Sequence, residues 1–177
     1  MKPTKPDASR GTRYQPDDPL EQISQEHLRQ REVCATLDKL AALKAPDLEL
    51  AAQVLPHFDT LLARHVEDEE DDLFPLLRAR SDPEDEINDT LDRLVGKHLV
   101  SLELAARVRD VVLAMANDNT LPDAEGAAAL VGFAAHERRH LIVENAIVLP
   151  LARARLTPDD LDELRARMAA RRAQGAQ

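Results

Sequence analysis

One eleven-residue pattern occurs twice in this chain, and its two copies begin 75 positions apart. The copies are His65–Pro75 and His140–Pro150; each reads His-x-x-x-Glu, then five residues ending in an apolar pair, then Pro. Residues four apart in an α-helix lie one turn apart on nearly the same face. Each copy therefore directs one imidazole and one carboxylate toward the same point. Two such helices facing each other would provide the ligands of a metal site inside a helix bundle.

The composition favours helices throughout the chain. At 177 residues, the chain is long enough for one domain with a sizeable core. Glycine is scarce, with five residues, and the aromatic residues are three Phe and one Tyr. Ala, Leu, Glu, Arg and Asp dominate instead, and most of these are residues that helices prefer. We therefore predict an all-α fold.

Apolar residues recur with helical spacing in four long stretches, and a short one follows. The predicted helices span about Leu20–Leu43, Asp47–Ala79, Glu84–Asn117 and Asp123–Ala154, and a fifth begins near Thr157. Pro56 and Pro75 lie within the second stretch, where each is expected to kink or end the helix because proline lacks a backbone donor. Four long helices joined by short loops predict an antiparallel up-down-up-down four-helix bundle with a short C-terminal fifth helix.

The chain divides into three predicted parts. Residues 1–19 are polar and contain proline, which is typical of a flexible arm. Residues 20–173 form the bundle domain, and residues 174–177 form a disordered tail. No stretch approaches the ~18 consecutive apolar residues of a membrane span, and the N-terminus lacks the apolar segment of a signal peptide. We therefore predict a cytoplasmic protein without a membrane partner.

Charge and cysteine usage exclude several classes of function. The formal net charge is −10, whereas binding to DNA or RNA needs a basic surface that faces the phosphates. Nucleic acid is therefore not a predicted partner. Cys34 is the only cysteine, which excludes an internal disulfide, a CxxC redox pair and a thiolate zinc cage. We expect Cys34 to be a small buried core residue.

Two further histidines complete the pattern of the repeated motif. His27 lies on the apolar stripe of the first predicted helix and His98 on that of the third, 71 positions later. The chain is thus two helical hairpins, each of which supplies a histidine and then His-x-x-x-Glu. A metal-free bundle would have to pair six inward polar groups among themselves, which is costly in an apolar core. The predicted ligands are His27, His65, Glu69, His98, His140 and Glu144.

The remaining candidate positions differ in their expected direction. His136 lies one turn before His140 on the same face and could supply a fifth imidazole. His57 is about 80° away from the direction of the ligand histidine two turns later, so we expect it outside the metal ligands. Most of the acidic run 67–72 should face water. Asp72 returns toward the inner face, where it could accept a hydrogen bond from a ligand imidazole or pair with an arginine.

The ligand types narrow the metal. Imidazole together with carboxylate suits iron, manganese, zinc or copper, and the residues alone do not decide among them. Six ligands from four helices are too many for one tetrahedral zinc, and structural zinc sites often use thiolates. The set instead suits two metals bridged by Glu69 and Glu144.

These residues resemble the hemerythrin-like (HHE cation-binding) family. The resemblance covers about Leu20–Arg172 and rests on His27, on "HVEDEEDDLFPLL", on His98 and on "HLIVENAIVLPLA". The ending "LTPDDLDELRARMAARR" resembles the C-terminal helix of bacterial members. The family implies two iron ions in a non-haem centre, bridged by two carboxylates and an oxo or hydroxo group. By position, Glu69 and Glu144 would bridge, and the four histidines at 27, 65, 98 and 140 would be terminal ligands.

One departure from the family separates this chain from the oxygen carriers. Those members have five ligand histidines, including a His-x-x-x-His pair on the third helix, whereas Leu94 and Leu102 lie one turn either side of His98 here. Either one iron has an open or water-filled position, or His136 supplies the fifth nitrogen. An open position would favour reaction with a small ligand over storage of O2.

The predicted function is to bind or sense O2, NO or peroxide at this centre. One alternative is an enzyme, a di-iron peroxidase or an NO-reducing protein. The other is an iron-handling or regulatory module whose metal occupancy controls partner binding. The residues identify no pocket for an organic substrate, no general base and no protein partner, so they do not decide between binding and catalysis.

Overall fold

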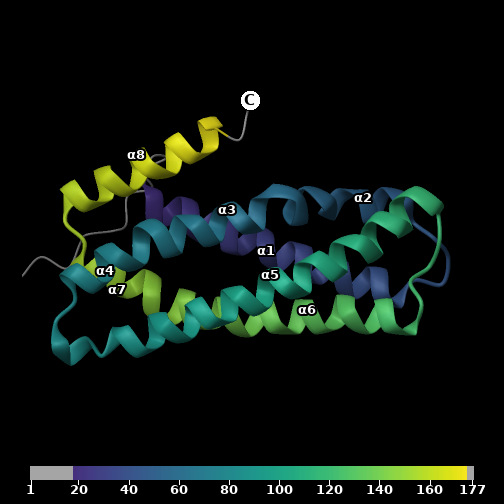
Figure 1. The fold of residues 1–177 in the computed structure, drawn as a ribbon, viewed down its shortest axis with the longest axis horizontal. Helices are drawn as coiled ribbons and strands as arrows, with labels where there is room; N and C mark the ends of the chain where they lie inside the picture. The colour runs from purple at the N-terminus through teal and green to yellow at the C-terminus, as the bar shows by residue number, and fades with distance from the viewer. Residues whose placement is uncertain (1–17, 175–177) are drawn as a thin grey trace, which may run out of the picture.

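The computed structural model describes residues 18–174, and these form an all-α fold without a strand in that range. The all-α prediction is confirmed. Helix α1 begins at Pro19 and helix α8 ends at Gln174, so most of the predicted flexible arm and disordered tail lies outside the described residues. In Figure 1, the four long helical stretches run side by side along the horizontal axis in alternating directions, and α8 lies at the upper left, beside the end of the bundle that holds α4.

Each long stretch matches a predicted helix to within about three residues. The first is α1 (Pro19–Ala42); the second runs through α2 (Leu48–Pro56), η1 (His57–Leu61), α3 (Leu62–Glu67), η2 (Asp68–Leu73) and α4 (Phe74–Arg80). The third is α5 (Ile87–Asp118), after the short turn η3 (Pro83–Asp85). The fourth runs through α6 (Ala124–Val143), η4 (Glu144–Val148) and α7 (Leu149–Arg155), and α8 spans Pro158–Gln174.

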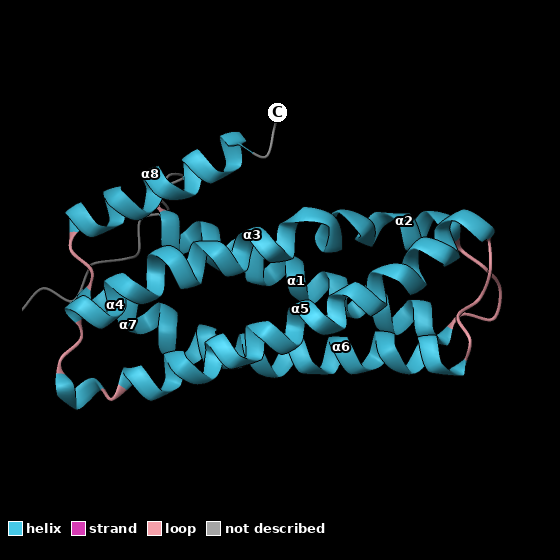
Figure 2. Ribbon diagram, in the orientation of Figure 1, coloured by secondary structure: helices cyan, strands magenta, loops and turns pink. Residues whose placement is uncertain are grey.

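The helices begin at capping residues and pack as adjacent antiparallel neighbours. Asp18, Asp47 and Asp123 each accept a hydrogen bond from a backbone N–H in the first turn that follows, which satisfies a donor that the helix itself cannot. Helix α1 packs against α6, α2 packs against α5, and α5 packs against α6. Figure 2 shows the connecting loops gathered at the two ends of the bundle, away from its middle.

The prolines of the second and fourth stretches do not end their helices. The segments η1, η2 and η4 are π-helical: the backbone widens so that an N–H reaches the carbonyl five residues earlier. The donors Phe74 and Leu149 bond in this way to the carbonyls of Glu69 and Glu144, and each donor directly precedes a proline. Proline has no N–H, and its ring crowds the carbonyl of an ordinary helical turn. The wider turn accommodates it, so both copies of the repeated motif contain a π-helical segment.

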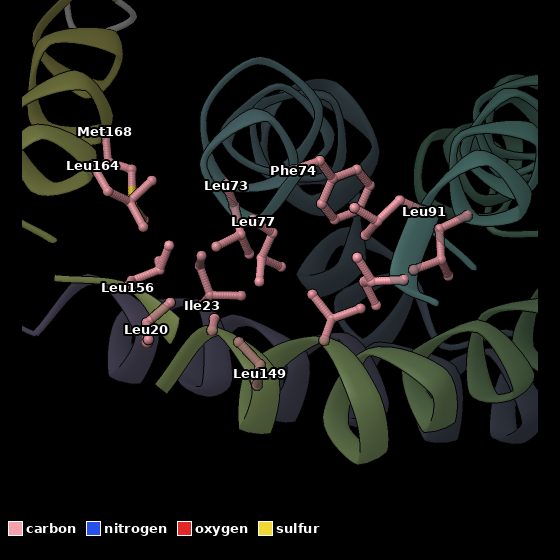
Figure 3. Close-up of a cluster of buried hydrophobic side chains, with 14 residues drawn as sticks. Leu20, Ile23, Leu73, Phe74, Leu77, Leu91, Leu149, Leu156, Leu164 and Met168 are labelled. Atoms are coloured by element: carbon pink, nitrogen blue, oxygen red, sulfur yellow. The ribbon is translucent and has the colours of Figure 1, made fainter. Parts of the chain in front are cut away.

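Two separate apolar clusters fill the bundle. The first contains Leu20, Ile23, Leu73, Leu91 and Val148 among its members, and Figure 3 shows how its side chains meet. The second contains Cys34, Val66, Ala105, Leu130 and Phe133 among its members, so Cys34 is a buried core residue as expected. Every long stretch contributes to both clusters. The histidines and glutamates of the two motifs, together with His27 and His98, lie near the junction of these contributions along each stretch, which places a polar layer between two apolar ones.

Helix α8 covers one side of the bundle. Its Leu164 and Met168 are buried and are directed into the first apolar cluster (Figure 3). Asp160 near its start accepts two hydrogen bonds from the guanidinium of Arg80 on α4, at 2.8 and 2.9 Å. Asp160 and Thr157 also exchange hydrogen bonds with each other's backbone N–H, which closes the first turn of α8. No helix among residues 18–174 is long and apolar enough to cross a membrane.

Candidate metal centre

The six predicted ligands meet in the middle of the bundle. They come from all four long helical stretches, and each side chain is at most 3% exposed. Their donor atoms form two overlapping groups, and within each group these atoms all lie within 4.8 Å of one another. The first group is His27, His65, Glu69 and Glu144; the second is Glu69, His98, His140 and Glu144. Both carboxylates belong to both groups, so a metal in each group would share them.

In the first group, the inward nitrogens of the two histidines face the carboxylates. His27 Nε2 lies 3.5 Å from Glu69 Oε1 and 3.4 Å from Glu144 Oε2. His65 Nε2 lies 3.7 Å from Glu69 Oε2. The rings of His27 and His65 meet edge to face, with their centroids 5.1 Å apart. Both rings therefore direct Nε2 into the space beside the shared carboxylates.

In the second group, the same arrangement comes from the other pair of helices. His98 Nε2 lies 3.3 Å from Glu69 Oε2 and 3.4 Å from Glu144 Oε1. His140 Nε2 lies 2.6 Å from Glu144 Oε1 and 2.9 Å from His98 Nε2. Phe74 stacks on the His98 ring at 5.9 Å between centroids, which fixes the plane of that ring. Four imidazoles thus surround two carboxylates with every Nε2 directed inward.

Outward-facing groups hold the opposite nitrogens of three of these histidines. His98 Nδ1 lies 2.6 Å from Glu70 Oε1, and His65 Nδ1 lies 3.2 Å from Glu26 Oε2. A carboxylate oxygen only accepts, so Nδ1 carries the proton in both rings and donates it. Nε2 is then the nitrogen that has a lone pair for a metal. Carboxylate partners on the outer nitrogen are typical of metal-binding histidines.

His27 is oriented by an amide instead of a carboxylate. Its Nδ1 lies 3.2 Å from Asn145 Oδ1, and Asn145 Nδ2 donates to the carbonyl of Leu141 at 2.7 Å. This second bond fixes which end of the Asn145 amide faces the ring, so His27 Nδ1 donates to it. Asn145 follows Glu144 directly, so one π-helical segment provides both a shared carboxylate and the support for a histidine.

Several inward atoms have no hydrogen-bond partner in the described part of the chain. They are His27 Nε2, His65 Nε2, both carboxylate oxygens of Glu69, and Glu144 Oε2. Buried polar atoms without a partner are rare in folded proteins, because each carries the cost of lost hydration. A metal in each group would accept these lone pairs. The arrangement of donors therefore fits a pair of metal ions.

Without a metal, the site balances its charges by binding protons. Burial opposes the charged form of His65, but the nearby Glu69, Glu26 and Glu144 carboxylates raise its pKa to about 9. Burial likewise opposes the charged form of His98, whereas Glu144 and Glu69 raise its pKa to about 10. Burial works against ionisation of Glu69, yet the surrounding histidines hold its pKa well below the usual range. A metal that enters the site must displace these protons.

The structure separates the other two histidines from the six. His136 Nε2 donates to the carbonyl of Lys97 on α5 at 3.2 Å, and His136 belongs to neither group of candidate ligands. His57 also belongs to neither group. Its ring is buried and lies edge to face against Phe58 and Phe133, at 5.0 and 6.4 Å.

The expectation that most of the acidic run 67–72 faces water is wrong. Asp68 and Asp72 are buried, and only Glu67 and Asp71 are exposed. The reason is that α8 packs over η2 and brings arginines onto this face. The guanidinium of Arg171 bonds to Asp72 Oδ2 at 2.8 Å and contacts Asp68 as well. Of the two alternatives for Asp72, the structure thus has the arginine pair.

Sequence reasoning missed the groups that support the ligands. Glu70 belongs to the acidic run that is expected to face water, but its side chain is 28% exposed and contacts His98. Glu26 is next to His27 in the sequence, and this position is the only sequence feature that could have indicated its role. Its partner in the structure is His65, which lies on another helix. A further buried carboxylate, Glu137, lies one turn before His140 on α6 and accepts a hydrogen bond from Ser101 Oγ at 2.5 Å.

Comparison with known proteins identifies the family. The model of the hemerythrin HHE cation-binding domain matches residues 18–152, which include all four long helical stretches up to α7 and all six candidate ligands. Helix α8 lies beyond the matched range. None of the curated proteins matches the chain at a significant level. The match covers most of the chain and agrees with the bundle and its buried histidine–carboxylate layer, so the chain belongs to the hemerythrin HHE cation-binding family.

Proposed function

We propose that this protein holds two iron ions, bridged by Glu69 and Glu144, and that it binds or senses O2, NO or peroxide at them. The observation that carries the proposal is the membership of both carboxylates in both groups of donor atoms. His27 and His65 would be terminal ligands to one ion, and His98 and His140 to the other. We leave His136 out of the ligand set, because its Nε2 donates to the Lys97 carbonyl.

The number of donors supports binding of a small ligand. Each group offers two imidazoles and two shared carboxylates, which is four protein donors for each ion. Non-haem iron sites that react with oxygen keep positions open beyond their protein ligands. When bound, a pair of ferrous ions would supply electrons and exchangeable positions for such a molecule. The carboxylates of Glu69 and Glu144 would cancel part of the positive charge of the two ions. Glu26 and Glu70 accept hydrogen bonds from the outer nitrogens of His65 and His98.

The test is the metal content of the full-length protein, purified without chelator from cells supplied with iron. Elemental analysis is expected to give close to two irons per chain. Mössbauer spectroscopy is expected to give the signature of an exchange-coupled pair. One metal per chain, or mainly zinc, would contradict the di-iron proposal. If two irons are present, Mössbauer spectra recorded after separate additions of O2, NO and peroxide identify which of these molecules binds at the site.

A regulatory module is the second candidate, and one observation favours it. His65 Nδ1 contacts Glu26, and Glu26 Oε1 accepts a hydrogen bond from Arg172 of α8 at 2.8 Å. A ligand histidine is thus joined to a helix on the surface, which metal occupancy could release for a partner. Apo-state unfolding without turnover would favour this role, whereas turnover of peroxide or NO that Glu69→Ala abolishes would favour an enzyme. The predicted cytoplasmic location remains a prediction.

A further inference from the structure

A cavity of about 170 Å³ lies between α1 and the stretch formed by η1 and α3, beside the first group of candidate ligands. The imidazole of His65 forms part of its wall. Binding sites for organic ligands usually measure about 300–1,000 Å³, and one water takes about 30 Å³ in the liquid. The cavity is therefore smaller than the usual site for a drug-sized ligand or cofactor, and it has room for a small molecule.

Two buried polar side chains line this cavity and are not used by the proposed metal centre. Gln30 is 4% exposed, and its Oε1 has no hydrogen-bond partner among the described residues. His57 is 5% exposed and has only ring contacts with Phe58 and Phe133 in that part of the chain. Burial is the largest cause that lowers the pKa of His57, which is about 4 when His65 is protonated, so the ring is neutral near pH 7. A neutral imidazole offers one donor and one acceptor, and a glutamine amide offers both as well.

Both side chains lie on the helical stretches that carry the first group of candidate ligands. Gln30 lies one turn after His27 on α1, and His57 lies two turns before His65 on the facing stretch. His57 and Leu61 are the first and last residues of the π-helical segment η1. Segments of this kind occur frequently at functional sites, because the extra residue changes the direction of side chains in the turn. The rim contains Arg29, which is largely exposed, and so the cavity reaches the surface.

We propose that this cavity binds a small uncharged molecule that both donates and accepts hydrogen bonds, with the chemistry of hydrogen peroxide, between Gln30 and His57. The unpartnered Gln30 Oε1 requires a donor, and the buried imidazole offers an acceptor nitrogen. O2 and NO have no O–H or N–H to donate to Gln30 Oε1. An anion such as azide also has none, so it could pair with Arg29 or Arg64 of the cavity wall but would leave that oxygen without a donor. The inference rests on the proposed function, since it assigns that centre a ligand class and a side of approach at His65.

The first experiment measures binding without chemistry. Full-length protein loaded with redox-inactive zinc and labelled with ¹⁵N-histidine is titrated with hydrogen peroxide and, separately, with azide. Peroxide is expected to shift the ring resonances of His57 in a saturable way. The nearly isosteric variant Gln30→Met is expected to weaken that response at least tenfold. Absence of a saturable shift, which means that the cavity holds only water, would overturn the proposal, as would a shift with azide alone.

The second experiment measures approach to the iron. Leu61→Trp places a large side chain in the wall of the cavity, and His57→Phe removes the polar atoms while keeping a ring against Phe133. The matched control is Ile147→Trp, in a separate cavity of about 230 Å³ beside Leu94 and Val143. At low peroxide, stopped-flow oxidation of the reduced iron protein is expected to slow at least tenfold in the first two variants and to be unchanged in the control.

The two experiments separate failure of this inference from failure of the proposed function. Elemental analysis is carried out on every variant, and the iron content of each is expected to equal that of the unmodified protein. Unmodified protein that contains no iron pair would contradict the proposed function, whatever the zinc-loaded protein does. Two results would overturn this inference alone, provided that the protein contains two irons. One is that peroxide does not shift the His57 resonances of the zinc-loaded protein; the other is that Ile147→Trp slows oxidation as much as Leu61→Trp and His57→Phe do.

Discussion

His27 and His98 face opposite oxygens of one carboxylate: His27 Nε2 lies 3.5 Å from Glu69 Oε1, and His98 Nε2 lies 3.3 Å from Glu69 Oε2. The two histidines come from α1 and α5, which belong to different hairpins of the bundle. One side chain therefore links the two halves of the site. Loss of this carboxylate and loss of a single histidine should have different consequences.

The shared carboxylates should affect both metals, whereas each histidine should affect one. Glu144→Gln removes the charge and keeps the shape, and we expect it to leave fewer than one metal per chain, because Glu144 belongs to both groups. His140→Ala should leave close to one metal, held by the first group. Elemental analysis of both variants beside the unmodified protein checks this. Equal metal contents in the two variants would contradict a shared carboxylate.

The outer partner of His98 should tune metal affinity without being a ligand. Glu70→Gln weakens the acceptor that lies 2.6 Å from His98 Nδ1, and we expect metal affinity to fall about tenfold to a hundredfold. The matched control is Asp71→Asn, an exposed neighbour in the same acidic run, which should leave affinity unchanged. Competition with a chromogenic chelator measures both. A similar loss in the control would indicate a general effect of charge.

The metal-free protein should lose stability as the pH rises. The folded pKa values of His65 and His98 are about 9 and about 10, above the value of about 6.5 for histidine in an unfolded chain. Their contribution to stability is complete below pH ~6.5 and is lost as the pH rises through the folded values. Between pH 7 and 9.5, we expect the free energy of unfolding of chelator-treated protein to fall by about 5 kcal/mol, because each unit of pKa shift is worth about 1.4 kcal/mol and over most of this range both folded histidines hold protons that the unfolded chain has released.

Metal loading should reverse this trend, because the metal takes the place of the protons on the imidazoles. The metal-loaded protein should therefore unfold at equal or higher urea concentration at pH 9 than at pH 7. Urea titrations of both forms across this range provide the measurement. A metal-free protein that becomes more stable toward alkaline pH would contradict the assigned direction of the pKa shifts.

Helix α8 should be held to the bundle by Arg172 more than by its exposed arginines. Arg172 is 22% exposed and pairs with the fully buried Asp68 as well as with Glu26. Arg172→Met leaves these carboxylates with fewer cations, and we expect a loss of about 2 kcal/mol or more. Arg167→Met removes a guanidinium that is 51% exposed, and it should cost less than about 1 kcal/mol. Urea unfolding measures both changes, and equal losses would contradict a special role for Arg172.

Sequence periodicity predicted the helices and the inward direction of the six polar side chains. The 3.6-residue repeat fixes where each side chain points around its own helix axis, so His65 and Glu69 share a face whatever surrounds them. The short loops then fix antiparallel neighbours. The repeated motif and the two further histidines were therefore visible in the sequence as one converging set, and the structure brings them within 4.8 Å of one another in two groups.

Only the tertiary structure decided which side chains contact the outer faces of the helices that carry the candidate ligands. Arg172 and Glu26 are 146 positions apart, and their contact depends on how α8 packs across the bundle. The same packing buries Asp68, which periodicity alone had placed among residues facing water. Direction around a helix is a local property of the chain, whereas burial depends on the neighbouring helix. The sequence by itself thus determined the bundle and its inward polar layer, and the tertiary structure determined the supporting contacts and the cavity beside them.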